Sequence, residues 1–77
     1  MDMSALVRFV AASLVDNPEA VDVREVEGPE SIVIELRVDP EDMGKVIGKQ
    51  GRIAKSIRSV VKAATVKNEK PVFVEIV

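Results

Sequence analysis

The sequence of 77 residues contains no cysteine and no histidine. It therefore has no thiols for disulfides or thiolate metal sites, and it lacks the commonest metal ligand and the usual general base of enzymes. Tryptophan and tyrosine are also absent, and there are two phenylalanines. Modules that stack bases on exposed rings need several aromatic residues, so that kind of platform is disfavoured. The apolar runs are too short for a membrane span or a signal peptide. These absences favour a cytoplasmic, non-catalytic module.

What the sequence does contain is the composition of one small globular domain, to which we assign residues 1–77. Hydrophobic residues make up 47% and charged residues 31% of the chain. That balance is typical of a folded soluble protein rather than of a disordered tail. We find no internal repeat, low-complexity tract or linker that would divide it.

The charges are distributed very unevenly along the chain. Residues 1–44 contain eleven acidic and three basic residues, whereas residues 45–70 contain eight basic residues and one acidic residue. The basic residues of the second segment are Lys45, Lys49, Arg52, Lys55, Arg58, Lys62, Lys67 and Lys70. The net charge of −2 therefore does not exclude a polyanionic partner, because such a partner responds to the local potential. The alternative is that these side chains only solvate a helix.

Residues 4–15 have the period of an amphipathic helix. The apolar side chains at spacings of three and four are Leu6, Phe9, Val10 and Leu14. The helix is expected to stop at Asp16, Asn17 and Pro18, because proline cannot continue the hydrogen-bond ladder. Since Phe9 lies on the apolar stripe, we expect it in the core rather than in contact with a base.

Residues 21–27 and 32–38 predict two strands of an antiparallel hairpin, with a turn at Gly28 and Pro29. In the second strand the inward-facing residues are Ile32, Ile34, Leu36 and Val38. In the first strand Val26 is out of phase with the preceding valines, which predicts a bulge near Arg24 and Glu25.

Two helices and a last strand complete the expected fold. Asp39 and Pro40 form a helix start, and this short helix must end at Gly48. A second helix is predicted from about Gly51 to about Val66. Its apolar face comprises Ile53, Ile57, Val60, Val61 and Ala64, and its opposite face carries Lys55, Arg58 and Lys62. Residues 71–77 alternate as a strand, in which Phe73 could face either the helices or the open side of the sheet. The order α-β-β-α-α-β predicts an α+β domain with helices packed on one face of a three-stranded sheet.

The segment Gly48-Lys49-Gln50-Gly51 joins the two helices and is the candidate for chemistry. Its glycines permit positive φ and the close approach of another backbone. Helix-start amides beyond Gly51 would form a phosphate site. The cations around it are Lys45, Lys49, Arg52 and Lys55. The alternative is an ordinary tight turn between helices with glycine caps.

The run Val46-Ile47-Gly48-Lys49-Gln50-Gly51-Arg52-Ile53 resembles the signature of the KH domain, a loop that clamps a nucleic-acid backbone. The element order resembles the type II form of that fold, and the size and charge pattern resemble the KhpA-like small bacterial KH proteins. The resemblance implies that Lys49 and Gln50 contact phosphate, and that the two glycines keep side chains away from the backbone. It also implies a groove for bases, with Ile47, Ile53 and Lys55 facing Val72 and Val74, and with Lys67 and Lys70 in the variable loop. The resulting RNA-binding set is Lys45, Ile47, Gly48, Lys49, Gln50, Gly51, Arg52, Ile53, Lys55, Lys67, Lys70, Val72 and Val74.

The leading hypothesis is a single-stranded RNA-binding protein that acts as a small RNA chaperone or post-transcriptional regulator within a dimer. The alternative, which the resemblance also implies, is an adaptor that forms homodimers and pairs with a larger KH-containing protein in the control of cell elongation. Duplex DNA binding through a helix-turn-helix is less compatible, because the first helix is short and acidic at its start. We expect no enzymatic activity, cofactor, metal, small-molecule substrate or membrane association.

Overall fold

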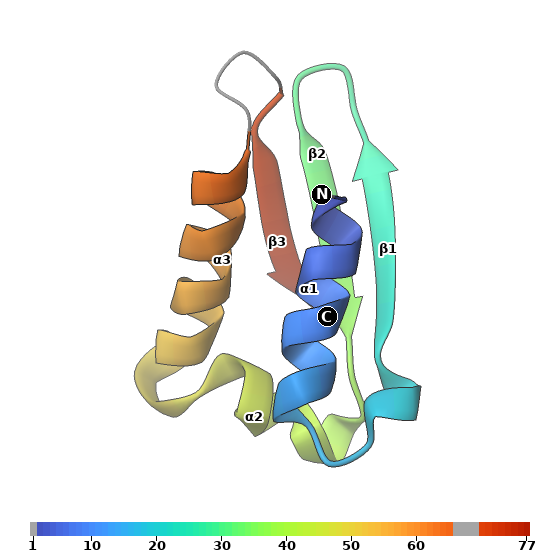
Figure 1. The fold of residues 1–77 in the computed structure, drawn as a ribbon, viewed down its shortest axis with the longest axis vertical. Helices are drawn as coiled ribbons and strands as arrows, with labels where there is room; N and C mark the ends of the chain where they lie inside the picture. The colour runs from blue at the N-terminus through green and yellow to red at the C-terminus, as the bar shows by residue number, and fades with distance from the viewer. Residues whose placement is uncertain (1, 66–69) are drawn as a thin grey trace.

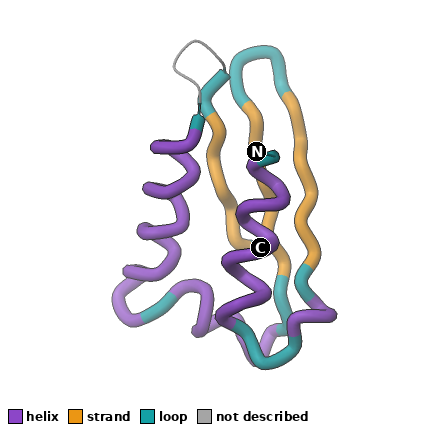
Figure 2. Tube along the Cα trace, in the orientation of Figure 1, coloured by secondary structure: helices purple, strands orange, loops and turns teal. Residues whose placement is uncertain are grey.

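The computed structural model describes residues 2–65 and 70–77. The elements in chain order are α1 (Met3–Leu14), β1 (Asp22–Glu27), β2 (Ile32–Arg37), α2 (Met43–Ile47), α3 (Arg52–Ala64) and β3 (Val72–Ile76). Short 3-10 turns precede β1, α2 and α3. The helices cover one face of the sheet and leave the other open (Figures 1 and 2). The predicted α+β class and element order are thus confirmed. The second helix was predicted to run to about Val66, but it ends at Ala64, with Thr65 in an extended conformation; Val66 itself lies outside the described residues.

The sheet has the order β1-β2-β3. Strands β1 and β2 pair antiparallel, as predicted, while β3 pairs parallel with β2. A parallel pair needs a crossover connection, and here α2, the glycine loop and α3 form it. The candidate loop therefore lies at the end of the domain where β2 ends, opposite the end where β3 begins (Figure 1).

The predicted bulge in β1 was wrong. The register runs without interruption from Asp22 opposite Arg37 to Glu27 opposite Ile32. Val26 is out of phase simply because it lies on the open face of the sheet, where its side chain is 47% exposed. A valine can occupy such a position in a regular strand at little cost, so its phase does not require an inserted residue.

The core lies between the sheet and the helices. The prediction for the inward face of β2 is confirmed, because Ile34 and Leu36 are fully buried and Val38 nearly so. In β3, Val74 is buried among them and Val72 and Ile76 are half-buried. Phe73 lies on the opposite, open face of the sheet.

Helix α1 presents a different face to the core from the one predicted. Val7 and Ala11 are fully buried, whereas Phe9 is 72% exposed, so the prediction that Phe9 packs in the core was wrong. On a helical wheel Val7 and Ala11 lie about 40° apart and Phe9 lies about 200° from Val7. Phe9 therefore points away from the sheet, at one margin of a wide apolar arc.

Helix α3 is rotated in the same way relative to its predicted face. The buried side chains are Ala54, Ile57 and Val61, while Val60 is 48% exposed and Ala64 is also exposed. Burial of Val60 and Ala64 was therefore wrongly predicted, and Ala54 was missed. The residues turned towards the sheet share the spacing 54, 57 and 61, which leaves Ile53 and Val60 at the side that faces α1. None of the helices in the described segments is both long and apolar enough to cross a bilayer.

Candidate nucleic-acid interface

The loop between α2 and α3 is a compact turn with a left-handed backbone. Gly48, Gln50 and Gly51 have φ of 77°, 60° and 73°. The Gly48 amide donates to the Gly44 carbonyl at 2.8 Å, and the Gly51 amide donates to the Gly48 carbonyl at 3.1 Å. The predicted positive φ of the two glycines is confirmed. The chain reverses here within four residues and presents Lys49 and Gln50 at the tip, where both are exposed.

The start of α3 offers fewer free amides than expected. The Arg52 amide donates to the carbonyl of Lys49, so the first N–H after Gly51 already has a partner. A phosphate at this loop would therefore depend on side-chain cations and on the remaining loop surface more than on a row of open helix-start amides.

The two glycines are required for different reasons. A Cβ at Gly48 would lie 2.6 Å from Cγ1 of Ile53 and 2.9 Å from its Cβ, which is an impossible approach. A Cβ at Gly51 would meet nothing within 4 Å. Gly48 thus allows internal packing of Ile53 against the loop, whereas Gly51 serves the left-handed turn and leaves open space in front of it.

The cations nearest the loop project into solvent. Lys49, Arg52 and Lys55 are exposed, and no ion pair between described residues involves them. Arg52 and Lys55 also border a shallow hollow on the outer side of α3, together with Ser56, Ser59 and Val60. The Nη2 atom of Arg52 donates to Oε1 of Gln50 at 3.3 Å, which holds the Gln50 side chain beside the helix.

Lys45 and Lys70, which the sequence also assigned to RNA, are engaged elsewhere. The Nζ atom of Lys45 lies 3.1 Å from a carboxylate oxygen of Asp16 and 3.3 Å from one of Asp42. The Nζ atom of Lys70 binds Glu27 and the carbonyl of Gly28, both at 2.8 Å. Lys70 therefore lies beside the β1–β2 turn. Lys67 is outside the described residues.

These contacts shift the ionisation of three groups. Hydrogen bonds to Asp16 and then Asp42 raise the pKa of Lys45. The hydrogen bond from the Asn17 amide lowers the pKa of Asp42, against the opposing effect of burial. The hydrogen bond and charge of Lys70 lower the pKa of Glu27. Among the described residues, no cluster of three or more acidic side chains is arranged to hold a metal ion.

The aliphatic residues that were expected to share one groove are divided between two. Ile53 belongs to an apolar groove between α1 and α3, while Val72 and Val74 line a hollow of about 250 Å³ between α3 and β3. Ile47 is partly exposed at the end of α2. The proposed arrangement of Ile53 opposite Val72 and Val74 is therefore not what the fold brings together.

The hollow between α3 and β3 contains cations that the site assignment omitted. It is lined by Arg58, Lys62, Thr65, Pro71, Val72, Phe73 and Val74. The Nε atom of Arg58 donates to the carbonyl of Val74 at 3.2 Å and so connects the helix to the edge strand. Arg58 and Lys62 were visible in the sequence as the basic face of the helix, but their position opposite β3 depends on tertiary packing.

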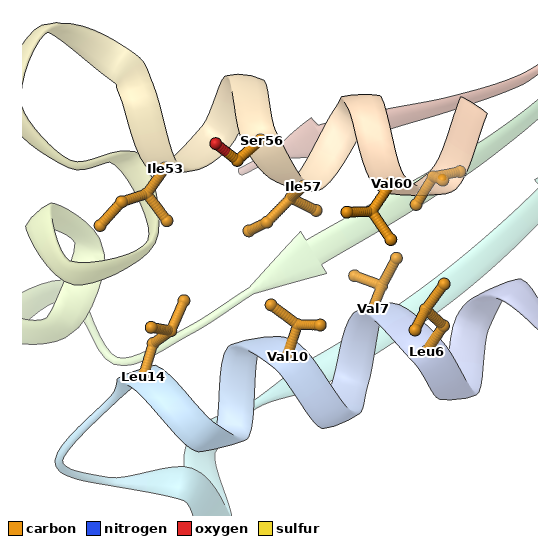
Figure 3. Close-up of a pocket in the computed structure, with 9 residues that line it drawn as sticks. Leu6, Val7, Val10, Leu14, Ile53, Ser56, Ile57 and Val60 are labelled. Carbon is orange, nitrogen blue, oxygen red and sulfur yellow. The ribbon is translucent and has the colours of Figure 1, made fainter. Parts of the chain in front are cut away.

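The groove between α1 and α3 has a volume of about 240 Å³ and an almost wholly apolar lining. Its side chains come from Leu6, Val7, Val10 and Leu14 on α1 and from Ile53, Ser56, Ile57, Val60 and Val61 on α3. Figure 3 shows the two sets facing one another across the groove. Val60 lies about 200° around α3 from Lys62, so the apolar groove and the basic face are on opposite sides of that helix.

The element order α-β-β-α-α-β, with a two-glycine loop between α2 and α3, defines a KH domain of the type II arrangement. Residues 4–76 match the family described as KhpA/KhpB, KH domain. The chain therefore belongs to the KhpA/KhpB family.

Similar curated proteins cover nearly the same length. The chain is 67% identical over 75 residues to RNA-binding protein KhpA of Clostridium perfringens, covering 97% of this chain and 100% of that protein. It is 63% identical to RNA-binding protein KhpA of Caldanaerobacter subterraneus, with the same coverage. It is 53% identical to RNA-binding protein KhpA of Aquifex aeolicus, covering 96% of this chain and 98% of that protein.

Among solved structures, the fold resembles part of Era. The TM-score is 0.64 for Aquifex aeolicus Era Y63A bound to GDP and AlF4⁻, at 24% identity, with 96% of this chain and 29% of Era covered. It is also 0.64 for Era in complex with MgGDPNP and nucleotides 1506–1542 of 16S ribosomal RNA, at 23% identity, with 97% and 30% covered. The chain thus spans less than a third of those structures, and the likeness concerns the fold alone.

Proposed function

We propose that this protein binds single-stranded RNA through the Gly48–Gly51 loop and the basic side of α3. The observation that carries the proposal is the exposed tip of Lys49 and Gln50 between two left-handed glycines, with the exposed cations Arg52 and Lys55 beside it. A polyanion gains favourable interactions at such a tip, because no acidic side chain in residues 2–65 and 70–77 pairs with these cations. The related proteins from three bacteria are named as RNA-binding proteins, which supports the same function here.

Single strands fit the site better than duplexes do. The hollow between α3 and β3 is of the size that accepts individual bases, and it lies on the side of α3 that carries Arg58 and Lys62. Single-stranded RNA can turn its bases into such a hollow while its phosphates follow the cations. In this proposal Val72 and Val74 contribute the apolar floor and Ile47 flanks the loop, whereas Lys70 would have to leave Glu27 to reach RNA. Action as an RNA chaperone or post-transcriptional regulator belongs to the same proposal.

Replacing both Lys49 and Gln50 with Asp tests the loop directly. Both side chains are exposed, and Asp tolerates the left-handed conformation of residue 50 better than most residues. We expect loss of RNA binding in a fluorescence anisotropy titration, with a melting curve like that of the original protein. Retention of full affinity would remove the loop from the mechanism.

A charge-matched pair separates local contact from overall charge. Lys49→Met and Arg24→Met each remove one positive charge, but Arg24 lies on the open face of the sheet, away from the helices. We expect Lys49→Met to reduce the slope of log affinity against log salt by about 0.7, the value for one phosphate contact on a single strand. Arg24→Met is expected to leave that slope unchanged.

Association with another protein is a second function, which the apolar groove between α1 and α3 supports. Leu14 and Val60 expose apolar surface there. Small domains with thin cores often gain stability from such contacts. We propose a homodimer through this groove, with pairing to a larger KH-containing protein linked to cell elongation as the alternative use. Because Arg58 and Lys62 lie across α3 from the groove, this association would leave the hollow between α3 and β3 accessible, whereas Ser56 and Val60 border both the groove and the hollow beside Arg52 and Lys55.

Sedimentation velocity at high micromolar concentration tests the association. Val60→Asp places a charge in the groove, and Val26→Asp places one on an equally exposed valine of the open sheet face, which makes it a matched control. We expect dimer in the original protein and in Val26→Asp, and monomer in Val60→Asp. A purely monomeric original protein would remove this second function.

A further inference from the structure

Asp42 is the buried charged residue of the described structure, with 3% of its surface exposed. It ends the 3-10 turn that leads into α2. One carboxylate oxygen accepts a hydrogen bond from the main-chain amide of Asn17 at 2.9 Å, and the other accepts one from Lys45 Nζ at 3.3 Å. Lys45 also reaches Asp16, and the Asn17 side chain donates to Asp39 at 3.2 Å. A polar cluster therefore joins the segment after α1 to the start of α2.

This cluster matters because α2 has few other attachments. The helix is five residues long, far below the length at which a helix is stable by itself, and its core contacts come from the buried Val46 and the half-buried Met43. Two apolar side chains attach so short a helix to the core, and the polar cluster at its first turn adds directional contacts that fix its orientation. Loss of the cluster would free the helix to tilt.

A tilt of α2 would pass directly to the loop. The Gly48 amide donates to the Gly44 carbonyl inside α2, and the Gly51 amide donates to the Gly48 carbonyl. The loop is therefore connected to the helix by consecutive hydrogen bonds, with no unbonded linker between them. Gly48 is also packed against Ile53, with no room for even a methyl group between them. The position of Lys49 at the tip therefore depends on the orientation of α2.

We propose that Asp42 and Lys45 are positioning residues, which hold α2 and the Gly48–Gly51 loop in place for RNA, and that Lys45 itself makes no phosphate contact. The proposal rests on the RNA-binding function proposed above. Lys45 would have to leave two carboxylates to reach a phosphate, whereas Lys49, four residues later, has no such partner among the described residues. Lys45 is therefore a poor phosphate ligand despite its place in the sequence.

Asp42→Asn provides a test in which charge and position predict opposite results. The substitution removes a negative charge, so electrostatics alone predicts tighter RNA binding. The amide side chain keeps one acceptor oxygen and replaces the other with an NH2 donor. It can therefore accept from the Asn17 amide or from Lys45 but not from both, and the other contact becomes two donors facing each other. We expect RNA binding to weaken by about three- to tenfold. Glu41→Gln removes the neighbouring acidic charge from an exposed side chain and is the control, with affinity expected to be unchanged or slightly tighter.

Lys45→Met and Lys49→Met form a second matched pair, each measured with a short fluorescein-labelled single-stranded RNA of mixed sequence over a salt series. We expect Lys49→Met to reduce the salt slope by about 0.7. We expect Lys45→Met to weaken binding at every salt concentration with the slope unchanged. Lys45→Met also retains the Asn17 bond to Asp42, so it provides the test if Asp42→Asn does not fold. A reduced slope for Lys45→Met would overturn the proposal, because it would show a direct contact.

Amide hydrogen exchange without RNA provides an independent readout. In Asp42→Asn and Lys45→Met we expect faster exchange at Gly51 and Arg52, with unchanged exchange at Ile34 in the core. Exchange at the original rate in the loop of both variants would overturn the positioning role. If the original protein did not bind RNA, the proposed function would fail, and the exchange data would still decide whether the cluster orders the loop.

Discussion

Substituting Gly48 by Ala tests the closest packing in the candidate site. Residue 48 has φ 77° and ψ 174°, a region that is essentially restricted to glycine and that costs other residues about 1–3 kcal/mol. The new methyl group would also lie 2.6 Å from Ile53 Cγ1, and forced overpacking of this kind costs about 1–3 kcal/mol. The expected loss of unfolding free energy is therefore about 2–6 kcal/mol. For a domain of this size that is a fall in melting temperature of at least about 8 °C.

Two other glycines provide internal controls. Gly51 is also left-handed, with φ 73° and ψ 15°, but its missing Cβ would meet open space, so Gly51→Ala should cost about 1–2 kcal/mol. Gly44 lies within α2 with nothing near its missing Cβ, so Gly44→Ala should stabilise the protein by about 0.5–1 kcal/mol. Thermal unfolding followed by circular dichroism is expected to rank the melting temperatures with Gly44→Ala highest, then the original protein, Gly51→Ala and Gly48→Ala.

A double-mutant cycle with Ile53→Ala identifies the contact responsible. Ile53→Ala removes the Cγ1 and Cδ1 atoms that the methyl group would strike, so it should cost less in the Gly48→Ala background than alone. Equal melting temperatures for Gly48→Ala and Gly51→Ala would refute the reasoning, because they would show that Ile53 does not press on the loop.

The remaining predictions concern the core, the exposed face of α1 and the response to acid. Leu36→Ala is expected to cost about 2–5 kcal/mol in urea unfolding because Leu36 is fully buried. Phe9→Ser is expected to stay within about 0.5 kcal/mol of the original protein at low concentration, since its ring lies in solvent. Asp42 and Glu27 have pKa values below their ordinary 3.8 and 4.5 in the folded state, so the stability that they contribute is present above those values and is lost as the pH falls below them. The melting temperature of Asp42→Asn should therefore fall less steeply with acidification than that of Glu41→Gln; equal slopes would contradict the assignment.

Local signals were sufficient to predict the elements and the loop. The cap at Asp39, the stops near Pro18 and at Gly48 and the alternation in β2 each act over a few residues. In the structure Asp39 caps the 3-10 turn that leads into α2, α1 ends at Leu14, α2 ends at Ile47, and β2 alternates as expected. The two-glycine turn is of the same kind, because positive φ at Gly48 and Gly51 follows from the sharp reversal between helices.

The orientation of helix faces could not be predicted from the sequence. The apolar arc of α1 is wider than the sheet can cover, so the pattern alone does not decide between Val7 and Phe9 for the core. The same uncertainty affected Val60 and Ala54 on α3. Which part of a broad arc is buried depends on where the neighbouring elements lie.

Charge partners distant in the sequence were also invisible. Lys45 meets Asp16, and Lys70 meets Glu27, only because α2 returns to the end of α1 and β3 begins near the hairpin turn. A count of basic residues therefore overstated the number available to RNA. Some lysines of the basic segment form ion pairs within the domain and others remain exposed, and the tertiary fold determines which do which.

The parallel pairing of β3 with β2 has a consequence for how the molecule forms. Hairpin β1–β2 joins neighbouring segments and can assemble early, but β3 reaches its place only after α2, the loop and α3 have crossed over the sheet. Contacts between such remote segments form slowly, because closing the intervening chain costs conformational entropy before the contacts compensate for it. The tip at Lys49 lies in that intervening chain, so its final shape belongs to the last stage of folding. A nascent or partly folded chain would then carry the positive charges of residues 45–70 without the folded geometry of the loop.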